Sequence, residues 1–168
     1  MRATHQRSDR SRPLYTDDQR RIRDRSVWTI VQGVLAPTQF LIFIISLLLV
    51  LRFLITGDGY DAAVLSVIAK TIALALIMAT GAIWEKEVFG QYLFADSFFW
   101  EDVVSMIVVA LHAIYVAALL LDIGGARAQM GVALAAYAVY VVNAGQFLWK
   151  LRVARLESAP QSAAGAPA

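Results

Sequence analysis

Four long runs of apolar residues dominate this chain and restrict the folds that are open to it. They cover residues 28–55, 62–84, 98–121 and 129–149. Each run is long enough to cross the hydrocarbon core of a bilayer as a helix, which takes about 20 residues. Four such spans leave no room for a separate soluble domain in a chain of 168 residues. We therefore expect an all-α polytopic membrane protein, a bundle of four transmembrane helices.

The polar ends of the chain flank this expected membrane domain, which we place at residues 16–156. Residues 1–15 are rich in Arg, Ser and Asp, and residues 157–168 are rich in Ala, Pro and Ser, so we expect both segments to be disordered. Between them, Thr16 and Gln19 have the spacing of a capping box, which predicts a short polar helix ahead of the first span.

The distribution of basic residues predicts the orientation of the spans. Eight Arg precede the first span, and Lys150, Arg152 and Arg155 follow the last. The connection at residues 57–59 carries no Lys or Arg. Because Lys and Arg favour the cytoplasmic side, both termini and the segment 88–99 are expected there. Membrane topology also explains the net charge of +2, since no nucleic-acid-binding motif accompanies the basic residues.

Two clusters of Trp and acidic residues bracket the segment 88–99. They are Trp84-Glu85-Lys86-Glu87 and Trp100-Glu101-Asp102. Charge is costly near hydrocarbon and usually marks a functional site, and Trp favours the membrane–water boundary. The alternative is that Glu101 and Asp102 only complement the dipole of the third helix, with Asp96 or Ser97 as its N-cap.

The third span carries its polar residues on one face. At 100° per residue, one stripe contains Glu101, Ser105, Val108, His112 and Tyr115. His112 lies about 16 Å from Glu101 along the helix axis. The stripe predicts a cavity with a carboxylate at its mouth and an imidazole at its floor. The alternative for His112 is a core imidazole bonded to a neighbouring helix.

Other polar and aromatic residues fall in the same halves of the spans. Gln32 and Gln39 lie in the first span, and Asn143 and Gln146 lie in the fourth. Tyr137 and Tyr140 form an aromatic stripe of the fourth span, which more often packs than binds a ligand. The remaining charge, Lys70, is expected to extend its ammonium to the opposite, non-cytoplasmic surface.

Several classes of site are excluded or disfavoured. The chain has no Cys, so disulfides, thiolate metal sites and a Cys nucleophile are excluded. It has no phosphate-binding loop, no Rossmann fingerprint and only two His, too few for a conventional metal site. We expect no metal of the protein's own, although His112 is a candidate axial ligand for a metal that arrives within a macrocycle.

Three segments carry a family resemblance, at residues 13–40, 81–106 and 135–152. They contain the runs VQGVLAP, IWEKEVFGQYLF, FFWEDV and NAGQFLWKLR. In these runs the chain resembles the vinyl (bacterio)chlorophyllide hydratases of bacteriochlorophyll synthesis, and the likeness covers nearly all of residues 13–156.

The resemblance implies a lyase that hydrates the ring-A 3-vinyl group of a chlorophyllide or bacteriochlorophyllide to a 1-hydroxyethyl group. It implies a multi-pass protein of the bacterial inner (intracytoplasmic) membrane. No cofactor is expected, because the Mg²⁺ is carried by the substrate. The expected partners are the chlorophyllide, the lipid membrane and other enzymes of the same synthesis.

The residue roles follow from the chemistry of hydration. An acid must protonate the terminal vinyl carbon, and a base must take a proton from the water that adds to the inner carbon. The candidate catalytic residues are Glu85, Glu101, Asp102 and His112. The candidate substrate-binding residues are Gln32, Gln39, Trp84, Lys86, Trp100, Tyr137, Tyr140, Asn143 and Gln146.

Two other functions fit the same composition. A tetrapyrrole-binding protein without catalysis would use the same aromatic and polar residues to hold a pigment. A photosystem-assembly protein would use its buried polar residues to join helices.

Overall fold

The computed structural model describes residues 14–158, and within this range every regular element is a helix. The helices are α1 (Asp17–Arg25), α2 (Val27–Thr56), α3 (Tyr60–Phe89), α4 (Phe99–Leu120) and α5 (Gly125–Ser158). The all-α prediction is confirmed for the described part of the chain. Most of the expected disordered segments, residues 1–13 and 159–168, lie outside it.

Four of these helices are long and apolar enough to cross a membrane. They are α2, α3, α4 and α5, as the four apolar runs predict. The 30 residues of α2 extend about 45 Å at about 1.5 Å per residue, more than the hydrocarbon core requires. The outward faces of the four long helices carry large apolar side chains, including Ile55, Leu65, Leu120 and Leu148. Such faces are expected for helices that contact lipid.

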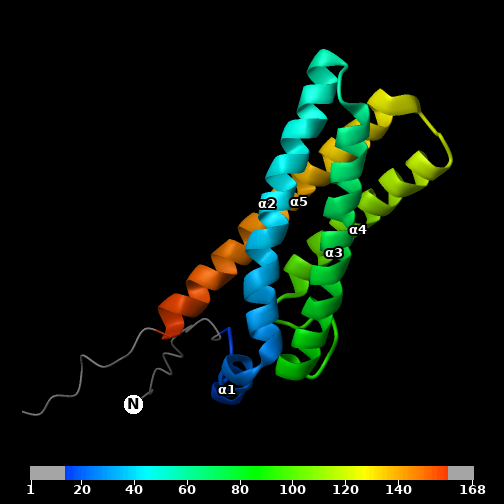
Figure 1. Cartoon of the computed structure of the whole chain (residues 1–168). Helices are drawn as coiled ribbons and strands as arrows, with labels where there is room; N and C mark the ends of the chain where they lie inside the picture. The colour runs from blue at the N-terminus through cyan, green and yellow to red at the C-terminus, as the bar shows by residue number, and fades with distance from the viewer. Residues whose placement is uncertain (1–13, 159–168) are drawn as a thin grey trace, which may run out of the picture.

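The bundle is built from two antiparallel hairpins. Helix α2 packs chiefly against α3, and α4 packs chiefly against α5. Figure 1 shows α2 and α3 side by side, with α5 crossing them at an angle. The turn between α2 and α3 is only three residues long, and Gly57 and Gly59 adopt φ values of 82° and 84° there. Glycine tolerates this left-handed conformation without a steric penalty.

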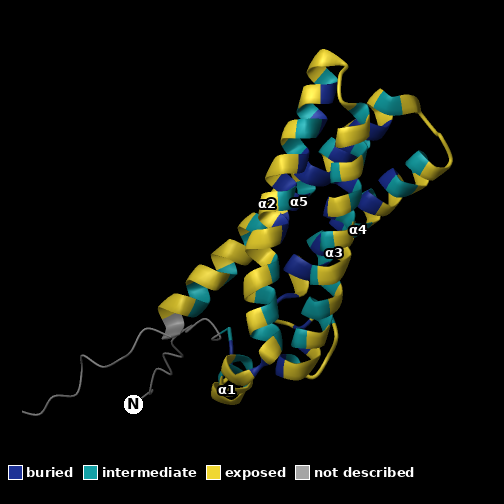
Figure 2. Ribbon diagram, in the orientation of Figure 1, coloured by how far each residue is buried: buried dark blue, intermediate teal, exposed yellow. Residues whose placement is uncertain are grey.

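The interior of the bundle combines aliphatic and aromatic side chains. Phe43 and Val50 from α2 and Val67 from α3 meet Tyr115 from α4 and Tyr137 from α5. Figure 2 shows the buried residues on the facing sides of the helices and the exposed ones on the outside. These buried tyrosines bring hydroxyl groups into the interior, so the core is not purely apolar.

A second, smaller cluster closes one end of the bundle. It contains Tyr15, Val88 and Phe98, with Phe89 and Trp84 packed beside them. Helix α1 begins at the predicted capping box, in which the Thr16 hydroxyl accepts from the Gln19 amide and the Gln19 side chain accepts from the Thr16 amide. Tyr15, at the edge of the expected disordered segment, stacks on Phe89 with ring centroids 5.7 Å apart.

Candidate functional site

The three acidic candidates lie together at the end of the bundle that the second cluster closes. Glu85 lies near the end of α3, and Glu101 and Asp102 lie in the first turn of α4. Their exposed fractions are 5%, 5% and 3%. The carboxyl groups of Glu85 and Asp102 face each other at hydrogen-bonding range. A hydrogen bond between two carboxyl groups requires a proton on one of them.

Glu85 and Asp102 also hold the connection between α3 and α4. Asp102 Oδ2 accepts from the backbone amide of Phe94 at 2.7 Å, and Glu85 Oε2 accepts from that of Ala95 at 3.4 Å. Phe94 adopts φ 61°, which is unusual for a residue other than glycine. The two carboxyl groups therefore have a structural role that the sequence did not suggest.

The predicted N-cap of α4 is wrong. The helix begins after Phe98, which makes no side-chain cap hydrogen bond. Ser97 instead donates its hydroxyl to the backbone carbonyl of Leu14 at 2.9 Å. The aromatic side chain of Phe98 enters the second cluster, so packing rather than capping chemistry fixes where α4 begins.

Glu101 has a different partner from the other two acids. Lys150 Nζ of α5 lies 3.5 Å from Glu101 Oε1, and the same ammonium donates to the backbone carbonyl of Ser97. It also lies 5.5 Å from the ring centroid of Phe98. Lys150 therefore joins the end of α5 to the start of α4, a role that its sequence position did not reveal.

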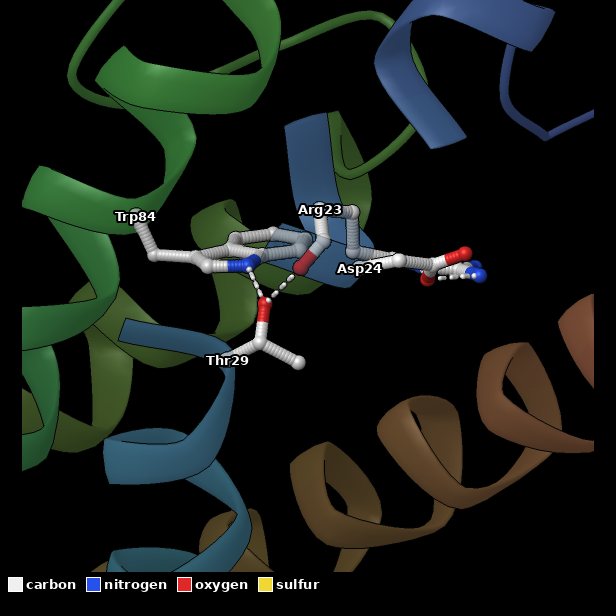
Figure 3. Close-up of polar contacts among 4 residues, drawn as sticks. All are labelled: Arg23, Asp24, Thr29 and Trp84. Atoms are coloured by element: carbon white, nitrogen blue, oxygen red, sulfur yellow. Dashed lines mark hydrogen bonds and ion pairs between the residues drawn. The ribbon is translucent and has the colours of Figure 1, made fainter. Parts of the chain in front are cut away.

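The candidates Trp84, Lys86 and Trp100 point in different directions. Trp84 is half-buried, and its Nε1 donates to the hydroxyl of Thr29 at 2.9 Å; that hydroxyl donates to the backbone carbonyl of Arg23 at 2.7 Å (Figure 3). Trp84 thus connects α3 to α2 and α1. Lys86 donates to the carbonyl of Gly90 at the end of α3. Trp100 is 68% exposed and packs edge-on against Phe99.

The candidate amide side chains join neighbouring helices. Gln32 donates to the hydroxyl of Thr80 at 2.7 Å. Asn143 and Ser105 exchange hydrogen bonds at 2.9 and 3.2 Å. The carbonyl oxygen of Gln146 is buried, with no hydrogen-bond partner among the described residues. Gln32 and Asn143 lie in the predicted halves of the helices, but each bonds to a side chain of a neighbouring helix.

The buried stripe of α4 matches the predicted one. Its buried residues include Glu101, Ser105, Val108, His112 and Tyr115. His112 is 1% exposed, and its Nδ1 lies 2.8 Å from the backbone carbonyl of Val108, within its own helix. Its Nε2 has no hydrogen-bond partner in the described part of the chain.

The tyrosine candidates of α5 lie in the bundle interior. Tyr137 and Tyr140 are 1% and 5% exposed. The hydroxyl of Tyr137 shares a hydrogen bond with that of Ser46 at 2.6 Å, and Gln39 donates to the hydroxyl of Tyr140 at 3.5 Å. Both rings also pack on Phe43. They support the bundle from inside and are not displayed as an open stacking platform.

The prediction for Lys70 is wrong. Its side chain is completely buried, and its ammonium lies 3.7 Å from the ring centroid of Tyr140. It does not reach the surface, because it lies on the face of α3 that packs inward with Val67 and Leu74. The end of the bundle opposite the acidic candidates contains a hydrogen bond of 2.7 Å from Tyr60 to Gln129.

One hollow of the bundle lies between α2 and α5, is apolar and does not involve the α4 stripe. This hollow is open to the outside of the bundle, and its lining includes Phe43, Leu47 and Tyr137. None of the acidic candidates lines it. Among the described residues, no group of three or more His, Asp or Glu side chains gathers to hold a metal ion.

Exposed aromatic residues lie next to the acidic cluster. Tyr92, Phe94, Phe99 and Trp100 are 61%, 40%, 43% and 68% exposed. Phe99 packs against both Phe94 and Trp100, with ring centroids 5.8 and 5.5 Å apart. We call these four residues the aromatic surface. Of them, only Trp100 is among the candidates predicted from the sequence.

Comparisons with known proteins agree with the resemblance seen in the sequence. Residues 15–153 match the family described as 2-vinyl bacteriochlorophyllide hydratase. A protein of that name from Rhodobacter capsulatus is 60% identical over 150 residues, which cover 89% of this chain and 87% of the relative. One from Cereibacter sphaeroides is 63% identical over 146 residues, which cover 87% of this chain and 91% of that relative. No solved structure matches the chain. The chain belongs to the 2-vinyl bacteriochlorophyllide hydratase family.

Proposed function

We propose that this protein adds water to the vinyl group of a bacteriochlorophyllide or chlorophyllide, giving a 1-hydroxyethyl group. The observation that carries the proposal is the 60% and 63% identity to hydratases over nearly the whole length of each chain. Family membership makes the protein a hydro-lyase of bacteriochlorophyll synthesis. The assignment of the reacting group as the 3-vinyl group of ring A belongs to the proposal. The choice between chlorophyllide and bacteriochlorophyllide belongs to it as well.

The facing carboxyl groups of Glu85 and Asp102 supply the proposed acid and base. One carboxyl group gives its proton to the terminal vinyl carbon, and the resulting cation at the inner carbon is stabilised by the conjugated macrocycle. The oxygen of water bonds to that carbon, and the water loses a proton to a carboxylate. The net change is addition of one H₂O, and the pair returns to its starting state.

Glu101 takes a supporting part in this proposal. Its carboxylate already has a cationic partner in Lys150, at 3.5 Å, whereas Glu85 and Asp102 face each other. We therefore assign proton donation to the facing pair. Glu101 and Lys150 position the start of α4, on which Asp102 lies.

The aromatic surface is the proposed docking site for the flat pigment. It adjoins Glu85 and Asp102, which we call the acid pair, because the backbone amide of Phe94 donates to Asp102. Aromatic rings stack on large π-systems at little entropic cost. A macrocycle lying on this surface would bring one edge toward Glu85 and Asp102. The ammonium nitrogen of the exposed Lys86 lies 5.4 Å from the ring centroid of Tyr92, a position from which it would meet an anionic substituent of the pigment.

Both ends of the chain carry an excess of basic residues, which supports a proposed orientation in the membrane. Leu14 and Lys150 both contact Ser97, so both described ends of the chain meet the α3–α4 connection at one end of the bundle. The excess of Lys and Arg in these segments favours the cytoplasmic face of a bacterial inner membrane. The substrate would then reach Glu85 and Asp102 from the cytoplasmic side.

Conversion by the purified protein tests the function. The full-length chain, in lipid nanodiscs, is incubated with a vinyl-bearing bacteriochlorophyllide in water enriched in oxygen-18, without added cofactor. We expect a 1-hydroxyethyl product that carries the heavy oxygen. A pigment that binds and remains unchanged would instead support a non-catalytic carrier.

A further inference from the structure

Polar side chains from all four long helices meet halfway along the bundle. They are Gln39 of α2, Lys70 of α3, His112 of α4 and Tyr140 of α5, and each is at least nine-tenths buried. This interior cluster is separate from the carboxyl groups at the end of the bundle: His112 is ten residues from Asp102, about 15 Å along α4.

Direct contacts connect three members of the interior cluster. Gln39 Nε2 donates to the hydroxyl of Tyr140 at 3.5 Å, and Lys70 Nζ lies over the ring of the same tyrosine at 3.7 Å. His112 lies in the same interior, with its ring centroid 6.0 Å from that of Tyr137, one turn from Tyr140 on α5. The four helices therefore direct these groups into the interior of the bundle and not toward lipid.

Three atoms of this cluster have no hydrogen-bond partner among the described residues: Gln39 Oε1, Lys70 Nζ and His112 Nε2. The ammonium of Lys70 is a donor. His112 Nδ1 lies against the carbonyl of Val108, which places the imidazole hydrogen on Nδ1 and leaves Nε2 as an acceptor. The amide oxygen of Gln39 is a second acceptor. Buried polar groups in proteins are almost always satisfied, so these three atoms indicate a ligand.

The mixture of donor and acceptors selects the ligand. An anion would suit Lys70 but would face the lone pairs of Gln39 and His112. A metal ion would suit the lone pairs but would be repelled by the ammonium. Water accepts from one group and donates to two, and a buried water typically has about two to four polar partners. Its small size also fits a closely packed interior.

We propose that Lys70, Gln39 and His112 bind water inside the bundle, and that this site supplies the hydration reaction. The proposal rests on the proposed function. In this arrangement Lys70 is a positioning residue: its ammonium donates to the water oxygen, and the water hydrogens point to Gln39 Oε1 and His112 Nε2.

A hydrogen-bonded pair lies between this site and the carboxyl groups. Ser105 and Asn143 bond to each other across α4 and α5, and both are buried. Ser105 lies one turn from Glu101, and Asn143 lies one turn from Tyr140. Together they form a polar route along which water and protons can pass between the interior cluster and the carboxyl groups.

Infrared difference spectroscopy tests the water site without relying on activity. Spectra of the full-length protein in nanodiscs are compared in ordinary water and in water enriched in oxygen-18. We expect the wild type to show an O–H band of isolated water that shifts with the oxygen isotope and is missing from Lys70→Met. Leu74→Met is the matched control, since Leu74 is buried one turn further along α3 and the swap conserves volume. It should keep the band. A wild type without the band, or a Lys70→Met variant that keeps it, would overturn the site.

Kinetics test whether this water serves the reaction. In Lys70→Met, we expect kcat to fall by about 10²-fold, the order that misplacing a reacting group costs, with the affinity for pigment unchanged. Loss of affinity and kcat in proportion to loss of folded protein would show a merely structural role. If Lys70→Met does not accumulate, Lys70→Gln replaces it, because its amide still donates to water. The water band of Lys70→Gln should persist at a shifted position. An unshifted band would refute contact between the water and residue 70.

The two proposals fail in different ways. If the wild type does not hydrate any vinyl pigment yet shows the water band, the proposed function is wrong and the water site stands. If the wild type hydrates the pigment but shows no such band, the function stands and the water site is wrong.

Discussion

Glu85 and Asp102 differ from Glu101 in what surrounds each carboxyl group. If the facing pair supplies the proton, Glu85→Gln and Asp102→Asn should each lower kcat by about 10²–10⁴-fold, the usual cost of losing a general acid. Pigment binding should persist, because an amide oxygen can still accept from the Phe94 or Ala95 amide. Steady-state kinetics on protein of matched folded fraction measures this.

Glu101→Gln is the comparison for these two variants. It removes the charge that meets Lys150 and leaves the facing pair intact. We expect a smaller loss of kcat than in either pair variant. Near-native turnover in Glu85→Gln and Asp102→Asn together with a large loss in Glu101→Gln would move the acid to Glu101.

Substitution of His112 distinguishes its proposed part in the interior water site from the axial-ligand role considered from the sequence. If its Nε2 accepts from interior water, His112→Phe should lower kcat for Mg-containing and Mg-free pigments alike and leave the affinity of both nearly unchanged. If it ligates the substrate Mg²⁺, affinity should fall for the Mg-containing pigment alone. Equilibrium binding of the two pigments, followed by absorbance, distinguishes these outcomes. The burial of His112 at 1% exposure favours the first.

The buried faces of the helices could be predicted from the sequence more reliably than the side chains that those faces contact. The α4 stripe from Glu101 to Tyr115 is buried as its helical period predicts. Lys70 was misplaced, because sequence gives the depth of a residue along a helix but not the neighbour that its face will meet. The ring of Tyr140, which covers its ammonium, lies 70 positions away in the chain. The roles of the Phe94 and Ala95 amides depend on loop geometry that no residue pattern encodes.

At the scale of elements, the apolar runs predicted the four long helices but not their full lengths. Helix α3 extends past the run at Trp84 to Phe89, and α5 extends past Trp149 to Ser158. The added turns are polar on one side, so hydropathy does not detect them, although the helical hydrogen bonds continue. The capping box at Thr16 placed the start of α1 correctly because its signal is local.

The docking of α1 depends on Tyr15, which stacks on Phe89 and lies under the guanidinium of Arg23 at 4.7 Å. Tyr15→Ala should release α1 from the end of the bundle, because removing a buried aromatic ring typically costs about 3–5 kcal/mol. We expect faster tryptic cleavage at Arg20, Arg21 and Arg23 in nanodiscs. Ile22→Ala is the control, since Ile22 is 40% exposed and should change little. Equal cleavage rates in the two variants would show that α1 is held by other contacts.

At the scale of the whole molecule, the two hairpins explain how polar groups persist inside a membrane bundle. Each hairpin packs closely within itself, and polar pairs between the hairpins, such as Ser46 with Tyr137 and Gln39 with Tyr140, lie in the interior. Hydrogen bonds of this kind join helices in lipid, where no water competes for them. The same arrangement leaves Glu85, Asp102 and the aromatic surface at one end of the bundle, so the proposed docking of a large pigment does not require the helices to separate.

Orientation is the property of the whole molecule on which that access depends. Because the chain has no Cys, one engineered thiol reports one position. Asp58→Cys and Ala128→Cys lie at exposed positions at one end of the bundle, and Asp96→Cys lies at an exposed position at the other. Asp58 is preferable to Gly59, whose φ of 84° would strain a side chain. In intact cells, a membrane-impermeant maleimide should label Asp58→Cys and Ala128→Cys and should label Asp96→Cys only after the cells are opened. The reverse pattern would place the acid pair on the outer side and contradict the cytoplasmic route for substrate.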